Sequence, residues 1–174
     1  NTIVVFASDQ GPARNTLNTR KANQVGDTTR ANMMGWTKGL RGGKHETYEG
    51  GPRIPFIVRW PDKVPAGAVN RTSILSGLDF LPTLCRLTGT SYDTRMVEGH
   101  DVADIWLGGN RIPERFLFWK KQYPTALHGD WKYHVNRREG DELYDLATDP
   151  NETMNVIDTH PKQAATMLEV IAAW

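Results

Sequence analysis

An acid and an amide follow one another where the first apolar run of the chain ends. Asp9 and Gln10 come soon after the β-branched and aromatic run IVVF at residues 3–6. In open α/β sheets, ligands bind outside the carboxyl ends of the strands. A carboxylate with an adjacent amide oxygen at that place offers two hard oxygen ligands to Ca²⁺ or Mg²⁺. An Asp after a strand also commonly serves as a turn or cap residue, so the pair alone fits both roles.

A single lysine stands among glycines in the segment LRGGKHETYEGG, residues 40–51. The Lys44 ammonium can bind a sulfate or phosphate oxygen as a point charge, with glycine amides nearby. A solvated surface loop has the same composition, and the local pattern does not decide between the two. His45 and Glu46 beside the lysine are candidates for proton transfer.

A third group of chemically useful side chains lies in the last third of the sequence. It combines aromatic and basic residues, namely His128, Trp131, Lys132, Tyr133 and His134. Such a set fits the rim of a sugar-binding surface. Alternating strand residues with one buried face explain it equally well.

The elements that must position these residues follow from apolar runs and turn signals. Residues 3–8, 54–60 and 72–78 are predicted to be strands of one mostly parallel sheet. Residues 11–53 are rich in Gly, Asn, Thr and Arg, which predicts a long functional loop with at most one short helix. Within it, residues 12–42 are expected to be poorly ordered or stabilised by a partner.

A helix is predicted from Asp79, as its cap, to about Leu87. Its apolar face combines Leu81 and Leu84 with Cys85, so the one cysteine of the chain is expected to be a buried small hydrophobe. A single cysteine also excludes an internal disulfide and a multi-cysteine zinc site.

The pattern changes near residue 115, where short strands replace the longer elements. Runs at 116–119, 126–135 and 142–146 with turn signals between them predict an antiparallel meander. A final helix is predicted to begin near Pro161 and to cover this second sheet. The side chains expected to face the sheet are Met167, Leu168 and Ile171.

Composition limits the classes of function. With 174 residues, 39% of them hydrophobic and 24% charged, the chain can bury a sizeable core. The net charge of +1 and the scattered basic residues lack the footprint of a nucleic-acid or anionic-membrane binder. No apolar run approaches the roughly 20 residues of a membrane span. An apolar strand at the very start of the sequence predicts that the chain is a segment of a larger protein. The alternative is a natural terminus on an edge strand.

Taken in order, these segments resemble the C-terminal part of the formylglycine-dependent sulfatases of the alkaline-phosphatase superfamily. NTIVVFASDQGP resembles the family's strand that ends in a metal-binding pair, and LRGGKHETYEGGPRIPFIVRWP resembles its segment with a sulfate-contacting lysine. LDFLPTLCRLTG, GDWKYH and ELYDLATDPNETMNV resemble the following helix and the C-terminal subdomain. The resemblance implies an α/β fold of the alkaline-phosphatase type. Residues 1–110 would belong to the catalytic domain, and residues 111–174 would form a small antiparallel sheet packed with a C-terminal helix.

The resemblance also implies a function, the hydrolysis of aryl or carbohydrate sulfate esters. Lys44 would be a catalytic residue on the sulfate, His45 would bind substrate, and Asp9 and Gln10 would bind Ca²⁺ or Mg²⁺. The glycines would let the loop pass close to the sulfate, and Glu49 and Arg53 would hold that loop. Since sulfatases of this kind are commonly exported, a periplasmic or secreted location is expected.

Several family features are replaced or absent. Gln10 stands where Asn or His is usual, and His45-Glu46 replaces a small Gly-Thr or Gly-Ser pair. The aldehyde nucleophile, formylglycine, is made from Cys/Ser-x-Pro/Ala-x-Arg, which this sequence lacks, since Cys85 is followed by RLTG. The chain is therefore expected to be a fragment that is inactive alone and is completed by a missing N-terminal part. The uncovered first strand is expected to favour self-association.

Two alternatives remain open at this stage. One is a phosphomonoester or phosphonate hydrolase of the same superfamily, which shares the metal chemistry. The other is a non-catalytic module that binds sulfated glycans. The nucleophile segment would distinguish the enzymes, and metal binding at Asp9 would separate an enzyme from a binding module.

Overall fold

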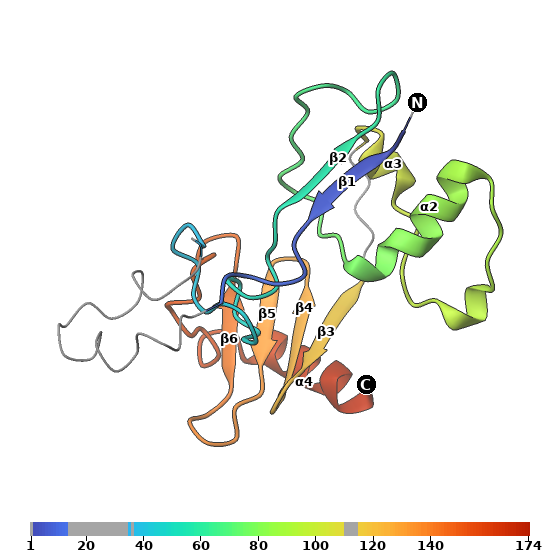
Figure 1. Ribbon diagram of the computed structural model, residues 1–174. Helices are drawn as coiled ribbons and strands as arrows, with labels where there is room; N and C mark the ends of the chain where they lie inside the picture. Colours follow the sequence, from blue (N-terminus) through green and yellow to red (C-terminus); the bar gives the residue numbers. More distant parts are fainter. Residues whose placement is uncertain (1, 14–34, 36, 110–114) are drawn as a thin grey trace. The chain divides into compact units, whose positions relative to one another are not determined.

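The computed structural model describes residues 2–13, 35, 37–109 and 115–174, which divide into two compact units (Figure 1). The first unit contains Asn1–Phe6 and Phe56–Arg115, and the second contains Ala7–Pro55 and Phe116–Trp174. These units do not coincide with the predicted boundary near residue 110, because the loop after the first strand belongs to the second unit. The disorder predicted for 12–42 concerns mainly residues 14–34 and 36, which lie outside the described residues.

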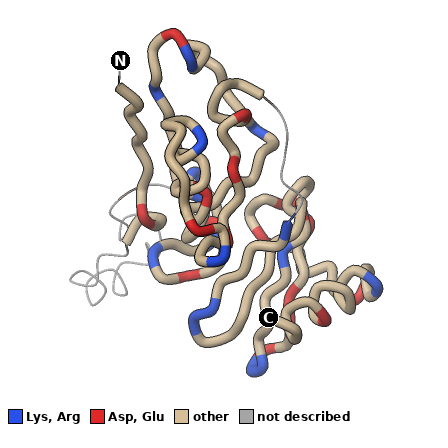
Figure 2. Tube along the Cα trace, turned by 90° about the vertical axis from the view of Figure 1, so that its right-hand side faces the viewer, with Lys and Arg blue, Asp and Glu red and all other residues tan. Residues whose placement is uncertain are grey.

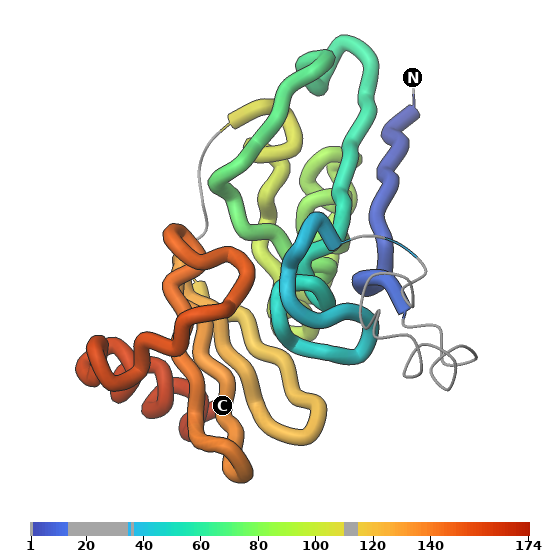
Figure 3. The backbone as a smooth tube through the Cα atoms, turned by 90° about the vertical axis from the view of Figure 1, so that its left-hand side faces the viewer, coloured from blue at the N-terminus to red at the C-terminus, as the bar shows by residue number. Residues whose placement is uncertain are grey.

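A two-stranded sheet in the first unit joins β1 (Val4–Ala7) to β2 (Phe56–Arg59). Both strands were predicted, but they run in opposite directions, as Figures 1 and 3 show, so a parallel arrangement is wrong for this pair. The cause lies in the connecting segment, which returns to the end of the sheet that it left. A backbone hydrogen bond of 2.7 Å from Gly11 N to Gly51 O closes that return.

One face of this small sheet packs on an apolar core. Val5, Phe56 and Val58 contact a cluster formed by Val102, Ile105 and Trp106, the last two on α3 (Ala103–Trp106). The apolar side chains on the other face of the strands are exposed, with exposed fractions of 48% for Val4, 60% for Phe6 and 60% for Ile57. The alternation of the strand residues therefore divides a buried set from an uncovered apolar set.

The third predicted strand, 72–78, is absent from the structure, and local polar bonds explain why. The Asn70 side chain accepts hydrogen bonds from the backbone N–H groups of Thr72 and Ser73, at 3.0 and 2.9 Å. Side-chain bonds of this kind offer the backbone an alternative to a sheet ladder. Ser76 then forms a capping box with Asp79 around the short 3-10 helix η2 (Gly77–Asp79).

The predicted helix is present as α2 (Phe80–Thr88), and it ends at Gly89 with a left-handed φ of 71°. Cys85 is a free, buried thiol, which confirms the expected role of a small hydrophobe. The expected apolar face is wrong at Leu81, which is 50% exposed. A second short 3-10 helix, η3 (Thr94–Met96), lies between α2 and α3.

Asp79 occupies the N-cap position of α2, but its side chain forms no capping hydrogen bond with that helix and instead forms a buried ion pair with Arg115. The two carboxylate oxygens accept from the guanidinium at 2.5 and 2.6 Å, and also from the backbone of Ser76 and His100. Burial alone raises the pKa of the Asp79 carboxyl, but the Arg115 and backbone hydrogen bonds outweigh it and leave that pKa lowered.

The second unit contains the predicted antiparallel meander, with strands in the order β3-β4-β5-β6. Their bounds are Phe116–Lys120, Pro124–His128, Trp131–His134 and Glu142–Asp145. The run predicted at 126–135 is a hairpin of two strands that turns at Gly129, where φ is 55°. The meander and the first pair of strands form separate sheets, as predicted.

The C-terminal helix α4 (Pro161–Ala173) supplies the core of this unit. Its Ala164, Met167 and Ile171 pack against Ala126, Tyr133 and Leu143 of the sheet. Leu168, also predicted to face the sheet, is 42% exposed. Each residue turns about 100° around the helix axis, so Leu168 lies beside the apolar stripe that Met167 occupies.

Charged residues of both signs alternate along the chain, without a long run of either sign (Figure 2). In the part of the chain that the structure describes, no helix has the length and apolar character needed to cross a membrane.

The first prediction concerns the buried pair of Asp79 and Arg115. Asp79→Asn removes one charge and leaves the other unpaired, which should lower the free energy of unfolding by about 3–5 kcal/mol. Urea unfolding at neutral pH measures the change. The control is Asp104→Asn, which removes one of two carboxylates from the exposed guanidinium of Arg86. A loss no larger than in this control would show that the buried pair contributes little.

Candidate functional site

The structure brings together the two sequence-predicted groups of site residues, which lie in the same unit. The Gln10 side-chain oxygen accepts a hydrogen bond of 3.2 Å from the His45 backbone N–H. The Lys44 backbone N–H donates to the Pro12 carbonyl at 3.0 Å. The segment that follows β1 and the lysine loop are therefore held side by side, although about 35 residues separate them in sequence.

Glycine is required here because backbone passes against backbone. A Cβ on Gly11 would lie 1.8 Å from the Gly50 carbonyl oxygen, and one on Gly51 would lie 2.0 Å from the Glu46 carbonyl oxygen. Neither position has room for a side chain. The glycines thus let the loop fold closely on itself and on the segment after β1. This close packing is a direct reason for the glycines, beside the approach to sulfate that the resemblance implied.

Lys44 and His45 stand at the exposed tip of this loop. Lys44 forms no ion pair with the residues that the structure describes, so its ammonium is available to an anion. His45 has a φ of 69°, in the left-handed region that favours glycine. That conformation explains physically why a glycine suits this position. A non-glycine residue held in it marks a place where the surroundings impose the backbone.

Asp9 and Gln10 offer oxygens of the type that Ca²⁺ and Mg²⁺ prefer. The Asp9 carboxylate is exposed and forms no hydrogen bond or ion pair within the described part of the chain. The Gln10 oxygen accepts one long hydrogen bond and keeps a second lone pair. This donor set fits a hard cation, yet among the described residues no group of three or more His, Cys, Asp or Glu side chains is placed to hold a metal. The two residues supply part of a coordination shell.

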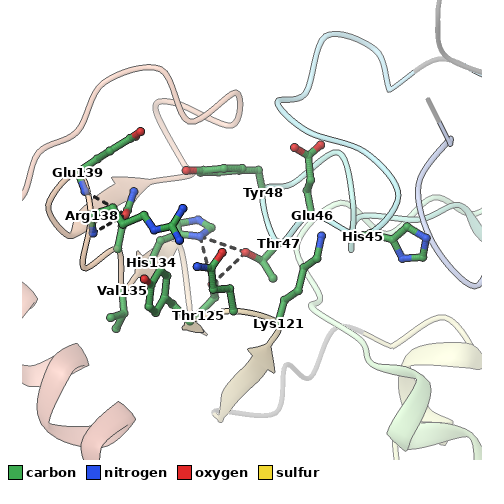
Figure 4. Close-up of a pocket in the computed structure, with 13 residues that line it drawn as sticks. His45, Glu46, Thr47, Tyr48, Lys121, Thr125, His134, Val135, Arg138 and Glu139 are labelled. Atoms are coloured by element: carbon green, nitrogen blue, oxygen red, sulfur yellow. Dashed lines mark hydrogen bonds between the residues drawn. The ribbon is translucent and has the colours of Figure 1, made fainter. Parts of the chain in front are cut away.

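A polar pocket of about 250 Å³ opens beside the loop tip. Figure 4 shows Arg138 and Glu139 on one side of it, His45 and Glu46 on the other, and Lys121 between them. The remaining lining residues are Thr47, Tyr48, Gln122, Tyr123, Thr125, His134, Val135 and Asn136. Every lining side chain except Val135 can donate or accept a hydrogen bond.

The expected sugar-binding rim around residues 128–134 is wrong, because most of its side chains are buried. The exposed fractions are 0% for Lys132, 2% for Tyr133 and 4% for His134. His128 stacks on Phe116 with ring centroids 4.1 Å apart. Of the five residues in the expected rim, only His134 lines the pocket. Period-2 alternation indicated a buried face but could not show that the basic residues occupy it.

The hydrogen bonds of His134 define its tautomer. Its Nε2 lies 2.9 Å from Glu152 Oε1, to which it donates. The Thr125 hydroxyl donates to the Thr47 oxygen at 3.0 Å, so the Thr47 hydroxyl is free to donate to His134 Nδ1 at 3.4 Å. This arrangement suits a neutral imidazole. Burial is the main reason that the pKa of His134 is lowered, with Lys132 acting in the same direction and Glu152 opposing both.

The loop behind Lys44 is held by residues that the sequence did not single out. Arg41 stacks on the Tyr48 ring, with its guanidinium carbon 3.7 Å from the centroid, and donates to the Tyr144 hydroxyl at 2.8 Å. Tyr48 donates to a Glu142 oxygen at 2.6 Å. Burial, followed by this hydrogen bond, raises the pKa of the Tyr48 phenol. The partners lie about 100 residues away, so no local pattern could identify them.

Glu49 holds the loop, as the resemblance implied. Its exposed fraction is 5%, and its Oε1 accepts from the buried Lys132 ammonium at 2.7 Å. The second oxygen, Oε2, lies 3.3 Å from the guanidinium of Arg53, a half-exposed side chain. Glu49 therefore supports the loop from inside, and Arg53 binds Glu49 from the surface.

Comparison with known proteins identifies relatives across this whole arrangement. The family described as Sulfatase matches residues 1–90, a stretch that contains Asp9, Gln10, Lys44 and His45. Arylsulfatase A from Homo sapiens is 29% identical over an alignment that covers 90% of this chain and 33% of the relative. An N-acetylgalactosamine-6-O-sulfatase from Bacteroides thetaiotaomicron is 28% identical, with coverage of 98% and 36%.

The fold is similar to that of solved structures as well. A structure from work on glycosaminoglycan metabolism by Bacteroides thetaiotaomicron matches with a TM-score of 0.78 and 26% identity, covering 99% of this chain and 38% of that chain. This similarity confirms the predicted fold class. The chain spans about a third of the length of the curated relatives it matches, 33% and 36% for the first two.

The backbone of His45 yields a prediction about stability. His45→Gly should raise the free energy of unfolding by about 0.5–1 kcal/mol, because glycine adopts φ of 69° without a Cβ penalty. His45→Ala removes the same imidazole but keeps the Cβ, and it should bring no gain. Denaturant unfolding of both variants beside the parent chain measures the difference, and equal effects would contradict the strain at this position.

A second prediction follows from the lowered pKa of His134. The folded state keeps this imidazole neutral, whereas the unfolded state binds a proton below a pH of about 6.5. Stability should therefore be complete above that pH and fall as the pH drops below it. The charged and titratable groups around the ring are Glu152, Lys132, Glu142, Tyr48 and Tyr144.

The test is urea unfolding between about pH 5 and 7.5. His134→Gln keeps an N–H donor toward Glu152 and should flatten the slope of stability against pH. His160→Gln, at an exposed histidine, should leave the slope as it is. An unchanged slope in His134→Gln would show that another group causes the pH dependence.

Proposed function

Since the chain belongs to the sulfatase family, we propose that it forms part of the active site of an enzyme that hydrolyses sulfate esters. The observation that carries the proposal is the joining of the Asp9–Gln10 pair to the Lys44–His45 tip by the Gln10–His45 hydrogen bond of 3.2 Å. The residues proposed for the anion and those proposed for the cation thereby lie next to one another.

Lys44 is proposed to bind a sulfate oxygen. An ammonium on an exposed tip, without a carboxylate partner among the described residues, keeps its full charge for a ligand. The sulfate gains negative charge on its oxygens as the ester bond to the alcohol breaks. A positioned cation stabilises that charge more in the transition state than in the bound ester, and this difference accelerates the reaction.

Asp9 and Gln10 are proposed to hold a divalent cation, Ca²⁺ or Mg²⁺. When bound, such a cation supplies positive charge at the reacting sulfate. Ca²⁺ prefers about six to eight oxygens, so other groups must complete the shell. The chain itself holds no Cys/Ser-x-Pro/Ala-x-Arg segment from which a formylglycine could be made. We therefore assign charge stabilisation and substrate contacts to these residues, and no nucleophile.

The pocket beside His45 is proposed to receive the alcohol portion of the ester. Its lining is almost entirely capable of hydrogen bonding, with Val135 as the one aliphatic residue. A hydroxyl-rich alcohol can satisfy such groups, whereas a flat apolar alcohol would leave them unpaired. This lining favours a carbohydrate sulfate over an aryl sulfate. Action outside the cytoplasm, in the periplasm or after secretion, is proposed on the resemblance to exported sulfatases.

The experiment uses the longest reading frame that contains these residues, assayed with a sulfated monosaccharide and with an aryl sulfate. Lys44→Ala should lower kcat by about 10²–10³-fold, and added metal should not restore it. Asp9→Ala should lose turnover by weakening metal binding, so a high Ca²⁺ concentration should restore part of it. Lys162→Ala, at an exposed lysine of α4, is the control and should retain full turnover.

The same assay tests the alternatives. The 174-residue chain alone should show no turnover, because covalent catalysis needs a nucleophile. Genuine turnover by the purified chain would overturn the assignment and place the active site elsewhere. Faster cleavage of phosphate or phosphonate esters than of sulfate esters would favour the related hydrolase. Binding of the sulfated sugar without turnover or metal dependence in the long frame would favour a glycan-binding module.

A further inference from the structure

Four ionisable side chains are buried together behind the Lys44 loop, within one unit of the structure. They are Glu49, Lys132, His134 and Glu152, with exposed fractions of 5%, 0%, 4% and 0%. Lys132 Nζ lies 2.7 Å from a Glu49 oxygen and 3.4 Å from a Glu152 oxygen. Buried charges persist only where they are paired and hydrogen-bonded. His134 borders the proposed alcohol pocket, but the proposed reaction assigns a chemical step to none of the four groups, so their presence in the interior requires another explanation.

Glu152 holds the lysine loop at both of its ends. Its side-chain Oε2 accepts from the Glu49 backbone N–H at 2.5 Å. Its backbone carbonyl accepts from the Arg41 guanidinium at 3.0 Å. Lys44 and His45 lie between these two anchor points. A backbone hydrogen bond of 2.7 Å from Gly50 N to Arg41 O closes the loop across its base.

The backbone of Glu152 is itself in an uncommon conformation, with a φ of 56°. For a residue with a Cβ this left-handed conformation is unfavourable, because the Cβ comes too close to the following carbonyl oxygen. It allows one residue to direct its carboxylate and its carbonyl to two separate points of the loop. Lys132 and His134 bind the Oε1 atom of the same carboxylate, at 3.4 and 2.9 Å. They hold this oxygen while Oε2 receives the loop.

From this geometry we propose that Glu152, supported by Lys132, is a positioning residue for Lys44. The inference depends on the proposed function only for what Lys44 does, since the anchoring itself is a matter of contacts. A displacement of about 1 Å at a group that acts on the transition state can cost on the order of 10²-fold in rate. The buried cluster thus keeps the exposed ammonium at one place against the sulfate.

Glu152→Gln is the direct test, because the amide keeps the size of the side chain but loses the charge and one acceptor. In the long reading frame, kcat should fall about 10–100-fold and KM should change little. The assay temperature is kept well below the melting temperature of the variant, so that unfolding does not contribute to the loss. Added to Lys44→Ala, the same change should cause no further loss, because Glu152 acts through Lys44. A loss that multiplies with that of Lys44→Ala would overturn the proposal.

Asp149→Asn is the matched control for instability of the turn. Asp149 is buried in the same turn and binds the backbone of Thr153 and Met154, at 2.7 and 2.8 Å, without contacting the lysine loop. It should lower the melting temperature and leave kcat intact. Should Glu152→Gln fail to fold, Arg41→Met removes one anchor while leaving the buried carboxylate in place. Arg41→Met should then lower kcat in the parent protein. Added to Lys44→Ala, it should cause no further fall in kcat.

A second readout does not require activity. Amide hydrogen exchange of residues 42–49 should become at least about 10-fold faster in Glu152→Gln and stay unchanged in Asp149→Asn. If the parent protein hydrolyses no sulfate ester, the proposed function fails, while this measurement still decides whether Glu152 fixes the loop. Equal exchange in the parent and in Glu152→Gln would overturn the positioning role.

Discussion

The ammonium of Lys132 has no exposed surface, and this single buried charge determines how the second unit is assembled. A lysine in the interior of a sheet needs carboxylates, and its own strand provides none on that face. The loop supplies Glu49, and the turn after β6 supplies Glu152. Three segments that are distant in sequence must therefore converge on one point, which places the base of the Lys44 loop against the sheet.

The glycines of the loop meet a second constraint, the lack of space between neighbouring backbones. The Gly11 N–H donates a hydrogen bond of 2.7 Å to the Gly51 carbonyl, and a Cβ on either residue would collide with a carbonyl oxygen. Because the backbones at the tip of the loop pack closely on one another, the side chains at the tip have no room inside, whereas Glu49 at its base points inward to Lys132. Lys44 and His45 are exposed for this reason. The close backbone packing that requires the glycines also leaves the residues proposed for the chemistry exposed.

Features set by local pattern could be predicted from the sequence, and features set by distant partners could not. Apolar runs, helical spacing and turn residues were sufficient to predict that β1, β2, the meander and α4 exist. The strand predicted at 72–78 failed because Asn70 and Ser76 satisfy the backbone locally. The direction of β2 depended on where the long loop returns. The resemblance assigned Gln10 to a metal and His45 to the substrate, but the hydrogen bond between them was found only in the structure. The roles of Lys132 and Glu152 depend on contacts between residues about 80–100 positions apart, which no window of sequence contains.

Lys44 and Lys132 show how their surroundings give opposite roles to two residues of one type. Lys132 forms buried ion pairs with two carboxylates, so its charge stabilises the structure and is not accessible to a ligand. Lys44 is exposed and has no such partner among the described residues, so its charge is available to an anion. Exposure alone would leave a flexible ammonium free to sample many positions. The loop resolves this conflict because its anchors are buried while its tip is open, and Glu152 connects the one to the other.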